Sequence, residues 1–460
     1  MIRRRYITEP SDIIVDARKS VNDAEIIRIL TADGRCKHST YLTKRNANKI
    51  TSPSGFKGNT IIEDMSWFKY SSVVKLYTDG SFNGCTSLRT ILIPKTFRDF
   101  GLYALQNCKS LESIDIPYGV TTIGQSSFAG CSSLKEFKIP RSVTTFGGYC
   151  LQNTTSLEEL FLPNSITGSL VRDQLRGSGI KRFIIEDNFP QTDLSGFGGL
   201  FYGCKNLEHV YVPEGVEYIS AGFLSNTNTL KSIVLPSTLK DIKEHCFYGG
   251  AIGKDTVFRI PQNVKSIGNK AFDSSYLDQN IPEGVESLGL YSLSNCKIDY
   301  VVIPKSLTTY LGDTQTESTT QFSGSRKSII VKDGNPVYHS IDNCMIETAT
   351  NRLVLGCLDS IIPEGVVEIA NAAFSRQGWK RMDRFILPST IQKIGKYAIY
   401  LIDIDKLVIK AVTPPEVVDR SSFNYANKIY VPDESVEAYK VANVFSEWAN
   451  RIYPISQLPE

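Results

Sequence analysis

Four histidines and ten cysteines are the residues of this chain best suited to bind a metal or to act as nucleophiles. The histidines, His38, His209, His245 and His339, are far apart, and no two of them have the spacing of a metal site. No two cysteines form the C-x-x-C pair of a zinc site. We therefore expect no metal site and no bound cofactor.

Other patterns that accompany catalysis are incomplete. Residues 177–179 read Gly-Ser-Gly, without the third glycine and the following helix of a dinucleotide loop, and neither a P-loop nor a nucleophile elbow is present. Asp403 and Asp405 are paired carboxylates in a turn or strand, where a surface role is favoured over ion binding. Asp333-Gly334-Asn335 is typical of a turn rather than of a calcium loop. We predict that the protein is not an enzyme.

Length and composition exclude several partner classes. The 460 residues are 41 % hydrophobic and 22 % charged, which is typical of a folded protein. A formal net charge of +3 gives no electrostatic case for a nucleic-acid partner. No window of the sequence approaches the ~20 apolar residues that a membrane span needs. We expect neither nucleic-acid binding nor membrane insertion.

The strongest pattern in the chain is a repeat. The stretch FNGCTSLRTILIP at 82–94 returns as FAGCSSLKEFKIP at 128–140 and as FYGCKNLEHVYVP at 201–213. Four of the final prolines follow one another at intervals of 23 residues: Pro94, Pro117, Pro140 and Pro163. We call this proline, or the residue at its place in a copy without proline, the anchor of its repeat. Such regular spacing predicts one structural unit stacked many times.

Each repeat predicts a short strand that ends at its proline. Apolar residues stand one and three places before the proline, as Ile93 and Ile91 do before Pro94. This period of two predicts a strand with one buried face, and the proline ends it because proline cannot donate a ladder hydrogen bond. Leucine six places before the proline and a Phe or Leu twelve places before it add to the core. With a second extended run, such as 120–124, each coil has two extended segments.

The cysteines follow the same period. Nine places before the proline the chain has only Cys or Thr in six repeats: Cys85, Cys108, Cys131, Thr154, Cys204 and Thr227. This choice indicates a small and mostly buried side chain. Coils stacked at the ~4.8 Å strand spacing would bring neighbouring thiols within reach of a disulfide. Because Thr replaces Cys in this series, we favour packed free thiols over disulfides.

The repeat predicts a mainly β solenoid with short helical turns, built from roughly fifteen coils. Residues 1–71 lack the repeat and predict a small mixed module, with a strand near 12–15 and a turn at Asp33 and Gly34. Residues 72–432 form the solenoid, with a polar insertion and a hairpin within 311–360. Residues 433–460 have apolar side chains at near-helical spacing and predict a C-terminal capping helix.

The repeat resembles that of the BspA-like leucine-rich repeat proteins, first associated with treponemal and Bacteroides surface antigens. The similarity rests on the F-x-G-C-x-S-L-x-x-I-x-I-P core, on 335–357, on TPPEV at 413–417 and on 429–452. It extends over about residues 72–455. It implies a leucine-rich-repeat solenoid and a role in adhesion or protein binding at a cell surface, and it carries no catalytic residues.

Candidate binding residues lie on the outward face of the strands. Two places before the proline, or its equivalent, the chain has many apolar residues, interrupted by Asp115 and Lys138. We predict that seven of these residues contact a partner: Leu92, Phe161, Ile184, Tyr211, Val234, Val302 and Tyr430. Contiguous exposed apolar surface is typical of a binding site. The alternative is that these side chains pack laterally on the sheet, where aromatic and β-branched residues are favoured.

Together these patterns predict a non-enzymatic scaffold that presents a rigid repeat surface to a protein or glycan on a cell surface. Acidic residues and a proline interrupt the first sixteen residues, so we expect no export signal of the usual kind. A second hypothesis follows, a phage virion structural or host-recognition protein in which residues 1–71 are the docking module. An enzyme of unknown class is the third.

Overall fold

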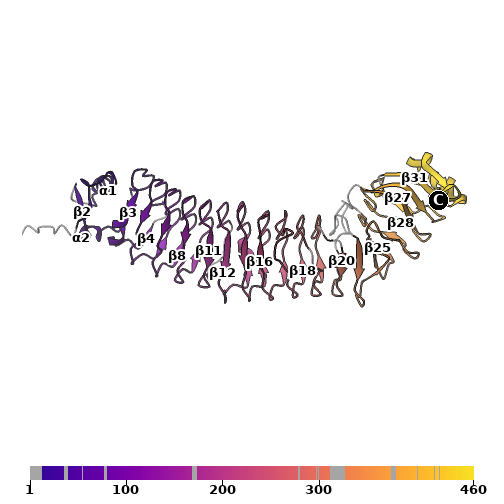
Figure 1. Ribbon diagram of the computed structural model, residues 1–460, viewed down its shortest axis with the longest axis horizontal. Helices are drawn as coiled ribbons and strands as arrows, with labels where there is room; N and C mark the ends of the chain where they lie inside the picture. The colour runs from indigo at the N-terminus through magenta and orange to yellow at the C-terminus, as the bar shows by residue number, and fades with distance from the viewer. Residues whose placement is uncertain are drawn as a thin grey trace, which may run out of the picture. The chain divides into compact units, whose positions relative to one another are not determined.

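The computed structural model describes residues 13–35, 40–53, 55–76, 80–167, 173–277, 280–296, 298, 300–310, 327–374, 380–400, 402–418, 420–423 and 425–459. The chain divides into two compact units: unit 1 holds residues 1–238 and 255–258, and unit 2 holds 239–254 and 259–460. Within each unit, short strands of successive coils lie side by side (Figure 1). The polar insertion predicted after residue 310 lies outside the described residues as far as residue 326.

Unit 1 begins with a small mixed module. Its elements are β1 (Ile13–Asp16), α1 (Val21–Ala32), β2 (Tyr41–Thr43), α2 (Lys44–Ala47) and the 3-10 helix η2 (Ser66–Tyr70). β1 and β2 pair antiparallel. The Ser20 side chain accepts a hydrogen bond from the backbone N–H of Asp23 and so caps the start of α1. The predicted strand is confirmed, and α1 ends at the predicted turn.

The segment before each proline forms parallel strands on one side of the unit 1 coils. These strands are β3 (Asp64–Met65), β5 (Thr90–Ile91), β7 (Ser113–Ile114), β9 (Glu136–Phe137), β11 (Glu159–Leu162), β12 (Arg182–Ile185), β14 (His209–Tyr211) and β16 (Ser232–Val234). Parallel pairing starts at β3, which lies in the N-terminal module predicted from the sequence. β11, β12, β14 and β16 form one four-stranded sheet.

A second extended segment completes each coil of unit 1. Its strands are β4 (Lys75–Leu76), β6 (Asp99–Phe100), β8 (Thr122–Ile123), β10 (Thr145–Phe146), β13 (Asp193–Leu194) and β15 (Tyr218–Ile219), with η3 (Ser195–Phe197) after β13. They are two-residue strands, and neighbouring coils pair in parallel, as β6 does with β8. Two extended segments in each coil were predicted, and both are present.

Unit 2 continues the coil pattern. Its two-residue strands are β17 (Asp241–Ile242), β18 (Ser266–Ile267), β19 (Ser287–Leu288), β21 (Thr309–Tyr310), β26 (Glu368–Ile369), β28 (Lys393–Ile394) and β30 (Glu416–Val417). Its longer strands are β20 (Tyr300–Ile303), β22 (Ser328–Val331), β27 (Lys380–Leu387), β29 (Ile402–Ile409), β31 (Tyr425–Val431) and β32 (Ile452–Pro454). The sheet order β27-β29-β31-β32 is parallel throughout.

Unit 2 also contains the predicted hairpin and the C-terminal cap. β23 (Tyr338–Ile341), β24 (Cys344–Glu347) and β25 (Arg352–Leu355) pair antiparallel in sequence order. The C-terminal part contains η5 (Arg420–Ser422), η6 (Asp433–Ser435), α3 (Val436–Val441), η7 (Phe445–Arg451) and η8 (Ile455–Gln457). The hairpin is confirmed. The predicted capping helix is shorter than its pattern suggested, and β32 adds a strand after it.

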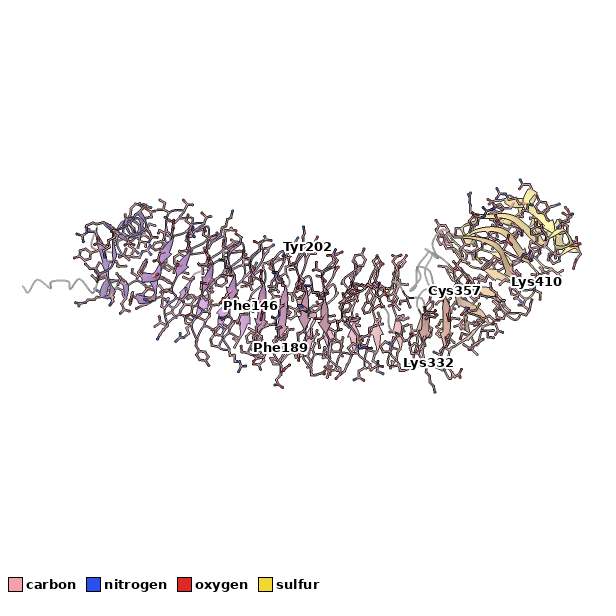
Figure 2. The ribbon with its side chains drawn as sticks, in the orientation of Figure 1. Phe146, Phe189, Tyr202, Lys332, Cys357 and Lys410 are labelled. Carbon is pink, nitrogen blue, oxygen red and sulfur yellow. The ribbon has the colours of Figure 1, made fainter. Side chains whose placement is uncertain are left out.

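The repeated apolar positions form the core. The leucines six places before each anchor are at most 6 % exposed, and the Phe or Leu side chains twelve places before it are buried as well. Phe100 packs against Phe128 of the next coil with their ring centroids 5.1 Å apart. Phe146 and Cys357, labelled in Figure 2, are both buried. Because each coil has apolar side chains facing its neighbours, stacking keeps them from water.

Successive coils of unit 1 have a left-handed residue ten places before the anchor. The φ angles there are +77° at Gly84, +60° at Asn107, +76° at Gly130 and +57° at Asn153. Glycine and asparagine are the residues that adopt this conformation most readily. A Cβ atom at Gly130 would lie 2.4 Å from Oδ1 of Asn107, so the side chain of one turn needs the bare backbone of the next.

The nine cysteines among the described residues are free and buried. Thiols of the repeated position donate to a carbonyl of the preceding coil, as Cys108 Sγ does to Phe82 O at 3.2 Å and Cys131 Sγ to Leu105 O at 3.2 Å. Thr154 instead donates to Leu151 O of its own coil at 2.7 Å. Burial raises the pKa of the Cys85 thiol to about 11. The structure therefore favours packed thiols over disulfides.

Candidate functional site

Four of the predicted binding residues lie next to one another in unit 1. Phe161 of β11 stands opposite Ile184 of β12, Ile184 opposite Tyr211 of β14, and Tyr211 opposite Val234 of β16. Phe161 is 43 % exposed and Val234 is 52 % exposed, and the two residues between them are half-buried. We call Phe161, Ile184, Tyr211 and Val234 the outer strip. Parallel register brings them together, because each stands at the same place in its coil.

Shallow hollows border the outer strip, and two of them lie at its central residues Ile184 and Tyr211. One, of about 470 Å³, lies beside Phe161, Ile184 and Tyr211 and is completed by polar residues that include Asn164 and Asp187. The other, of about 370 Å³, lies over Ile184, Tyr211 and Val234. An exposed apolar row with hollows at its sides can hold the side chains of an extended segment.

Polar groups line the edges of the outer strip. Tyr211 Oη donates to Asp187 Oδ1 at 2.6 Å, and this carboxylate raises the pKa of the phenol. His209 Nδ1 lies 2.7 Å from Ser232 Oγ, and an Nη atom of Arg182 lies 3.4 Å from a carboxylate oxygen of Glu159. An apolar centre with a polar rim is the usual composition of a protein interface.

Two of the other predicted residues lie apart from the outer strip. Leu92 is half-buried near the N-terminal end of unit 1, and the polar positions Asp115 and Lys138 separate it from Phe161. Val302 lies in unit 2, on β20, where it stands opposite Ile330 of β22. Ile330 is 52 % exposed. Leu92 and Val302 are therefore not part of the outer strip.

The prediction that Tyr430 is exposed is wrong. Tyr430 lies on the outward face of β31, in register with Val408 of β29, but it is only 2 % exposed and Val408 only 3 %. The Tyr430 ring lies 5.9 Å, centroid to centroid, from the Tyr453 ring of β32. The chain after β32 then passes over this face, because Arg384 Nη2 of β27 donates to Pro459 O at 2.7 Å. Residues 455–459, the C-terminal tail, thus cover these strands.

The repeat pattern gave no sign of this cover. The tail sequence, ISQLP, is short and has no period of its own. Pro459 O accepts a hydrogen bond from Arg384, Ser456 N donates one to Asp433 Oδ1 at 3.1 Å, and η8 lies near β31. A contact between segments 75 residues apart leaves no regular spacing in the sequence.

A ladder of alternating charge was also overlooked. Five places before each anchor, unit 1 carries eight residues of alternating sign: Glu63, Arg89, Glu112, Lys135, Glu158, Lys181, Glu208 and Lys231. Three of the ion pairs between neighbouring coils have N–O distances of 2.8 Å, namely Lys135 with Glu112, Lys181 with Glu158 and Lys231 with Glu208. Reading the repeat column by column would have shown this ladder.

Residues considered for chemistry have structural partners instead. Asp405 binds Arg381 through two hydrogen bonds of 3.0 and 2.9 Å, which lower the pKa of the carboxyl. Gly334 has a φ of +82°, as the predicted turn requires. Within the described ranges, no three His, Cys, Asp or Glu side chains gather in a way that could hold a metal ion. The same ranges contain no helix with the length and apolar content needed to cross a bilayer.

Comparison with known proteins identifies the repeat. The pattern of the BspA type leucine-rich repeat region matches six copies over residues 50–170, 198–318 and 357–436. No curated protein matches the chain.

Several solved structures are similar to the chain. A leucine-rich repeat protein from Bacteroides ovatus shares 21 % identity, with 83 % of this chain and 88 % of that chain covered and a TM-score of 0.48. One from Eubacterium ventriosum shares 18 %, with 50 % and 68 % covered and a TM-score of 0.37. The pneumococcal vaccine antigen PcpA shares 14 %, with 74 % and 92 % covered and a TM-score of 0.32. Because the family pattern matches most of the length of this chain, the chain belongs to the BspA type leucine-rich repeat family.

Proposed function

We propose that this protein is a non-enzymatic interaction scaffold at a cell surface and that the outer strip binds an extended segment of a partner protein. The observation that carries the proposal is the alignment of Phe161, Ile184, Tyr211 and Val234 into one uncovered row on four neighbouring strands. Contiguous apolar surface on a folded protein usually marks an interaction site.

The C-terminal tail supports the choice of a short chain segment as the partner. In unit 2 the outward face of β29 and β31 is covered by residues 455–459 of the chain itself. The covered residues, Val408 and Tyr430, stand two places before their anchors, as the residues of the outer strip do. A short segment of chain therefore fits the outward face of this repeat.

The outer strip has the residue types of an interface centre. Phe161 and Tyr211 are aromatic side chains that bury a large area at a low cost in side-chain entropy. The hydrogen bond from Tyr211 to Asp187 holds the phenol in place before a partner arrives. Because the Tyr211 ring is held in advance, binding costs less conformational entropy.

The decisive experiment changes Phe161 and Tyr211 to Ser together. Peptide binders would be selected from a random library against the wild-type chain, and their affinities measured by biolayer interferometry. We expect the double substitution to lower the affinity of peptides that bind the outer strip by at least ~10-fold, since each aromatic side chain contributes about 1–2 kcal/mol or more to binding. The melting temperature should stay nearly unchanged.

A matched control changes Tyr202 and Val441 to Ser, which are 54 % and 80 % exposed and lie elsewhere. This control should keep the peptide affinity within about 2-fold of the wild-type value, as surface substitutions away from the site usually do. Selected peptides that bind both variants equally well would contradict the proposal. Unfolding of the Phe161→Ser, Tyr211→Ser variant would favour the alternative that these residues pack laterally on the sheet.

A further inference from the structure

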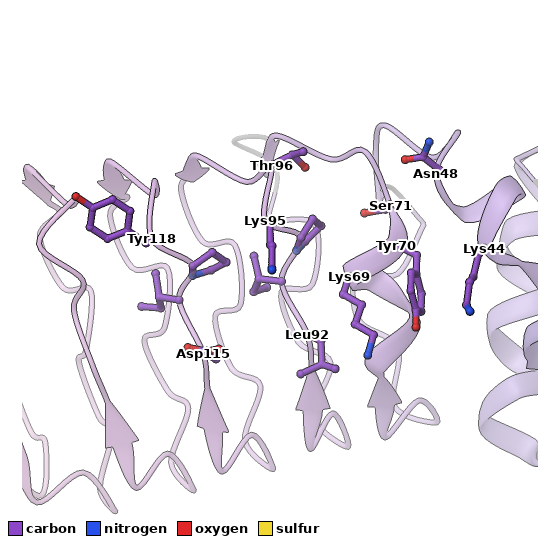
Figure 3. Close-up of a pocket in the computed structure, with 14 residues that line it drawn as sticks. Lys44, Asn48, Lys69, Tyr70, Ser71, Leu92, Lys95, Thr96, Asp115 and Tyr118 are labelled. Carbon is purple, nitrogen blue, oxygen red and sulfur yellow. The ribbon is translucent and has the colours of Figure 1, made fainter.

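A hollow of about 890 Å³ lies near the N-terminal end of unit 1, away from the outer strip. Its walls come from α2, from η2 and from the segments that follow β5 and β7 (Figure 3). The charged residues of the wall are Lys44, Lys69, Lys95 and Asp115. Tyr70 and Tyr118 are its aromatic residues. Of this wall the repeat pattern predicted only Leu92, and five of the fourteen wall residues lie in the module without repeats.

The three lysines of the hollow lack carboxylate partners among the described residues. Elsewhere in unit 1 lysines pair with a glutamate of the preceding coil, as Lys135 does with Glu112 and Lys181 with Glu158, both at 2.8 Å. Three ammonium groups around one hollow repel one another unless an anion lies between them. The hollow therefore favours a negatively charged ligand.

Tyr70 is held between two of these lysines. Lys44 Nζ lies 5.7 Å and Lys69 Nζ 5.2 Å from the centroid of its ring. Figure 3 shows Tyr70 between Lys69 and Lys44, with Lys95 further along the same wall. These cation–π contacts fix the charges near the ring. Tyr118 at the other end is 81 % exposed, so its ring is free to lie against a ligand.

Asp115 and the hydroxyl groups of the wall favour an acidic saccharide over an acidic peptide as the ligand. The Asp115 carboxylate repels any acidic ligand, but it can accept hydrogen bonds from the hydroxyl groups that a sugar has and a polyglutamate peptide lacks. Ser71 is 5 % exposed, and its hydroxyl has no hydrogen-bond partner among the described residues. Thr96 and Asn48 add further polar groups to the wall. An acidic saccharide carries both hydroxyl and carboxylate groups, so it matches the polar side chains and the lysines of this wall.

We propose that this hollow binds a carboxylate-bearing saccharide, with the lysines on its carboxylate groups, Asp115 on its hydroxyl groups and Tyr118 against a sugar ring. The site shares no residue with the outer strip, so the two proposals stand or fall separately. Lysine binds carboxylates as a flexible point charge, which suits a ligand with several acidic groups. Binding should weaken as salt is raised, because the hollow is open to solvent.

The experiment measures binding of three probes to the full chain by isothermal titration calorimetry. The probes are tetragalacturonate, a hyaluronan tetrasaccharide and 3′-sialyllactose, each compared with its carboxyl-reduced form. We expect at least one acidic probe to bind and its reduced form to bind at least ~10-fold more weakly. No binding by any of the three would overturn the proposal.

Variants then locate the binding site. Lys69→Gln with Lys95→Gln should lower the affinity at least ~10-fold, since each lost charge-assisted contact is worth about 1 kcal/mol or more. The matched control, Lys135→Gln with Lys181→Gln, removes two ion-paired lysines and should change it less than 2-fold. Equal losses in both variants would indicate general charge attraction and contradict the proposal.

A last comparison separates a sugar from an acidic peptide. Asp115→Ala should weaken the saccharide, because an acceptor for its hydroxyls is lost, but it should strengthen a hexaglutamate peptide by removing repulsion. Tyr118→Ser should weaken the saccharide alone. If hexaglutamate bound wild type more tightly than every acidic saccharide, the hollow would be a peptide site and the assignment wrong. The Phe161→Ser, Tyr211→Ser variant should bind the saccharide as wild type does.

Discussion

Tyr211 and Tyr430 occupy the same place in their coils, two residues before the anchor on the outward face of a strand. In unit 1 Tyr211 belongs to the outer strip and is half-buried, with Val234 beside it 52 % exposed. In unit 2 Tyr430 is 2 % exposed and its neighbour Val408 is 3 % exposed. The strands, their spacing and the direction of the side chains are alike. The exposures differ because the C-terminal tail covers the outward face at Tyr430 and leaves the outer strip uncovered.

A repeat determines the direction of a side chain and its neighbours, but not what covers it. Position in the coil determines whether a side chain faces the core or faces outward, and parallel register determines which side chains meet. Neither determines what lies over the outward face. Apolar residues there gain free energy when any segment covers them, whether it belongs to the same chain or to another. In unit 2 that segment is the tail, and for the outer strip we propose a partner.

The largest expected effect is on the stability of unit 2. Tyr430→Ala should lower the free energy of unfolding by about 3 kcal/mol, because it removes a buried aromatic ring. Tyr211→Ala should cost about 1 kcal/mol or less, since its ring is half-buried and held by one hydrogen bond. Urea unfolding, followed by hydrogen exchange in peptides from β31 and β14, measures each unit. Equal costs for the two tyrosines would break the comparison.

The next effect comes from removing the tail. A chain that ends at Pro454 leaves Val408 and Tyr430 exposed on the outward face, and β31 should lose about 2 kcal/mol of protection. Hydrogen exchange should speed up in β29 and β31 and stay unchanged in β11 to β16. A dye that fluoresces on apolar surfaces should bind the shortened chain more strongly. Unchanged exchange in β31 would mean that another segment buries Tyr430.

The smallest effect concerns the charge ladder of unit 1. Lys135→Glu places like charges beside Glu112 and Glu158, the acidic residues of the two neighbouring coils. Because these side chains are largely exposed, we expect a loss of about 1 kcal/mol or less, reduced further in 1 M salt. Lys109→Glu makes the same change of charge at an exposed position outside the ladder and is the control. A loss that salt does not reduce would show that the Lys135 stem, rather than its charge, matters.

Much of the fold followed from the sequence because each coil repeats the same local rules. The prolines marked strand ends, the Leu, Phe and Cys columns are buried, and the alternation before Pro163 placed Phe161 outward. The hairpin formed by β24 and β25 also followed from its two apolar runs and their turn. These features depend on neighbours within one or two coils.

The candidate sites were harder to predict, because they depend on contacts without a period. Tyr430 has the residue type and position of an exposed site, and only the distant tail buries it. The lysine hollow joins Lys44 and Lys69 of the N-terminal module to Lys95 and Asp115 of the coils. The sequence alone did not indicate how that module lies against the first coils.

The charge ladder has a consequence for how such a chain can change in length. Glu112, Lys135, Glu158 and Lys181 alternate, so deleting a single coil would bring two residues of the same sign into contact. Deleting two neighbouring coils would preserve the order. The charge pattern of unit 1 therefore repeats every two coils, although the structural repeat is one coil. Gene duplications and losses in this region should be tolerated best in even numbers.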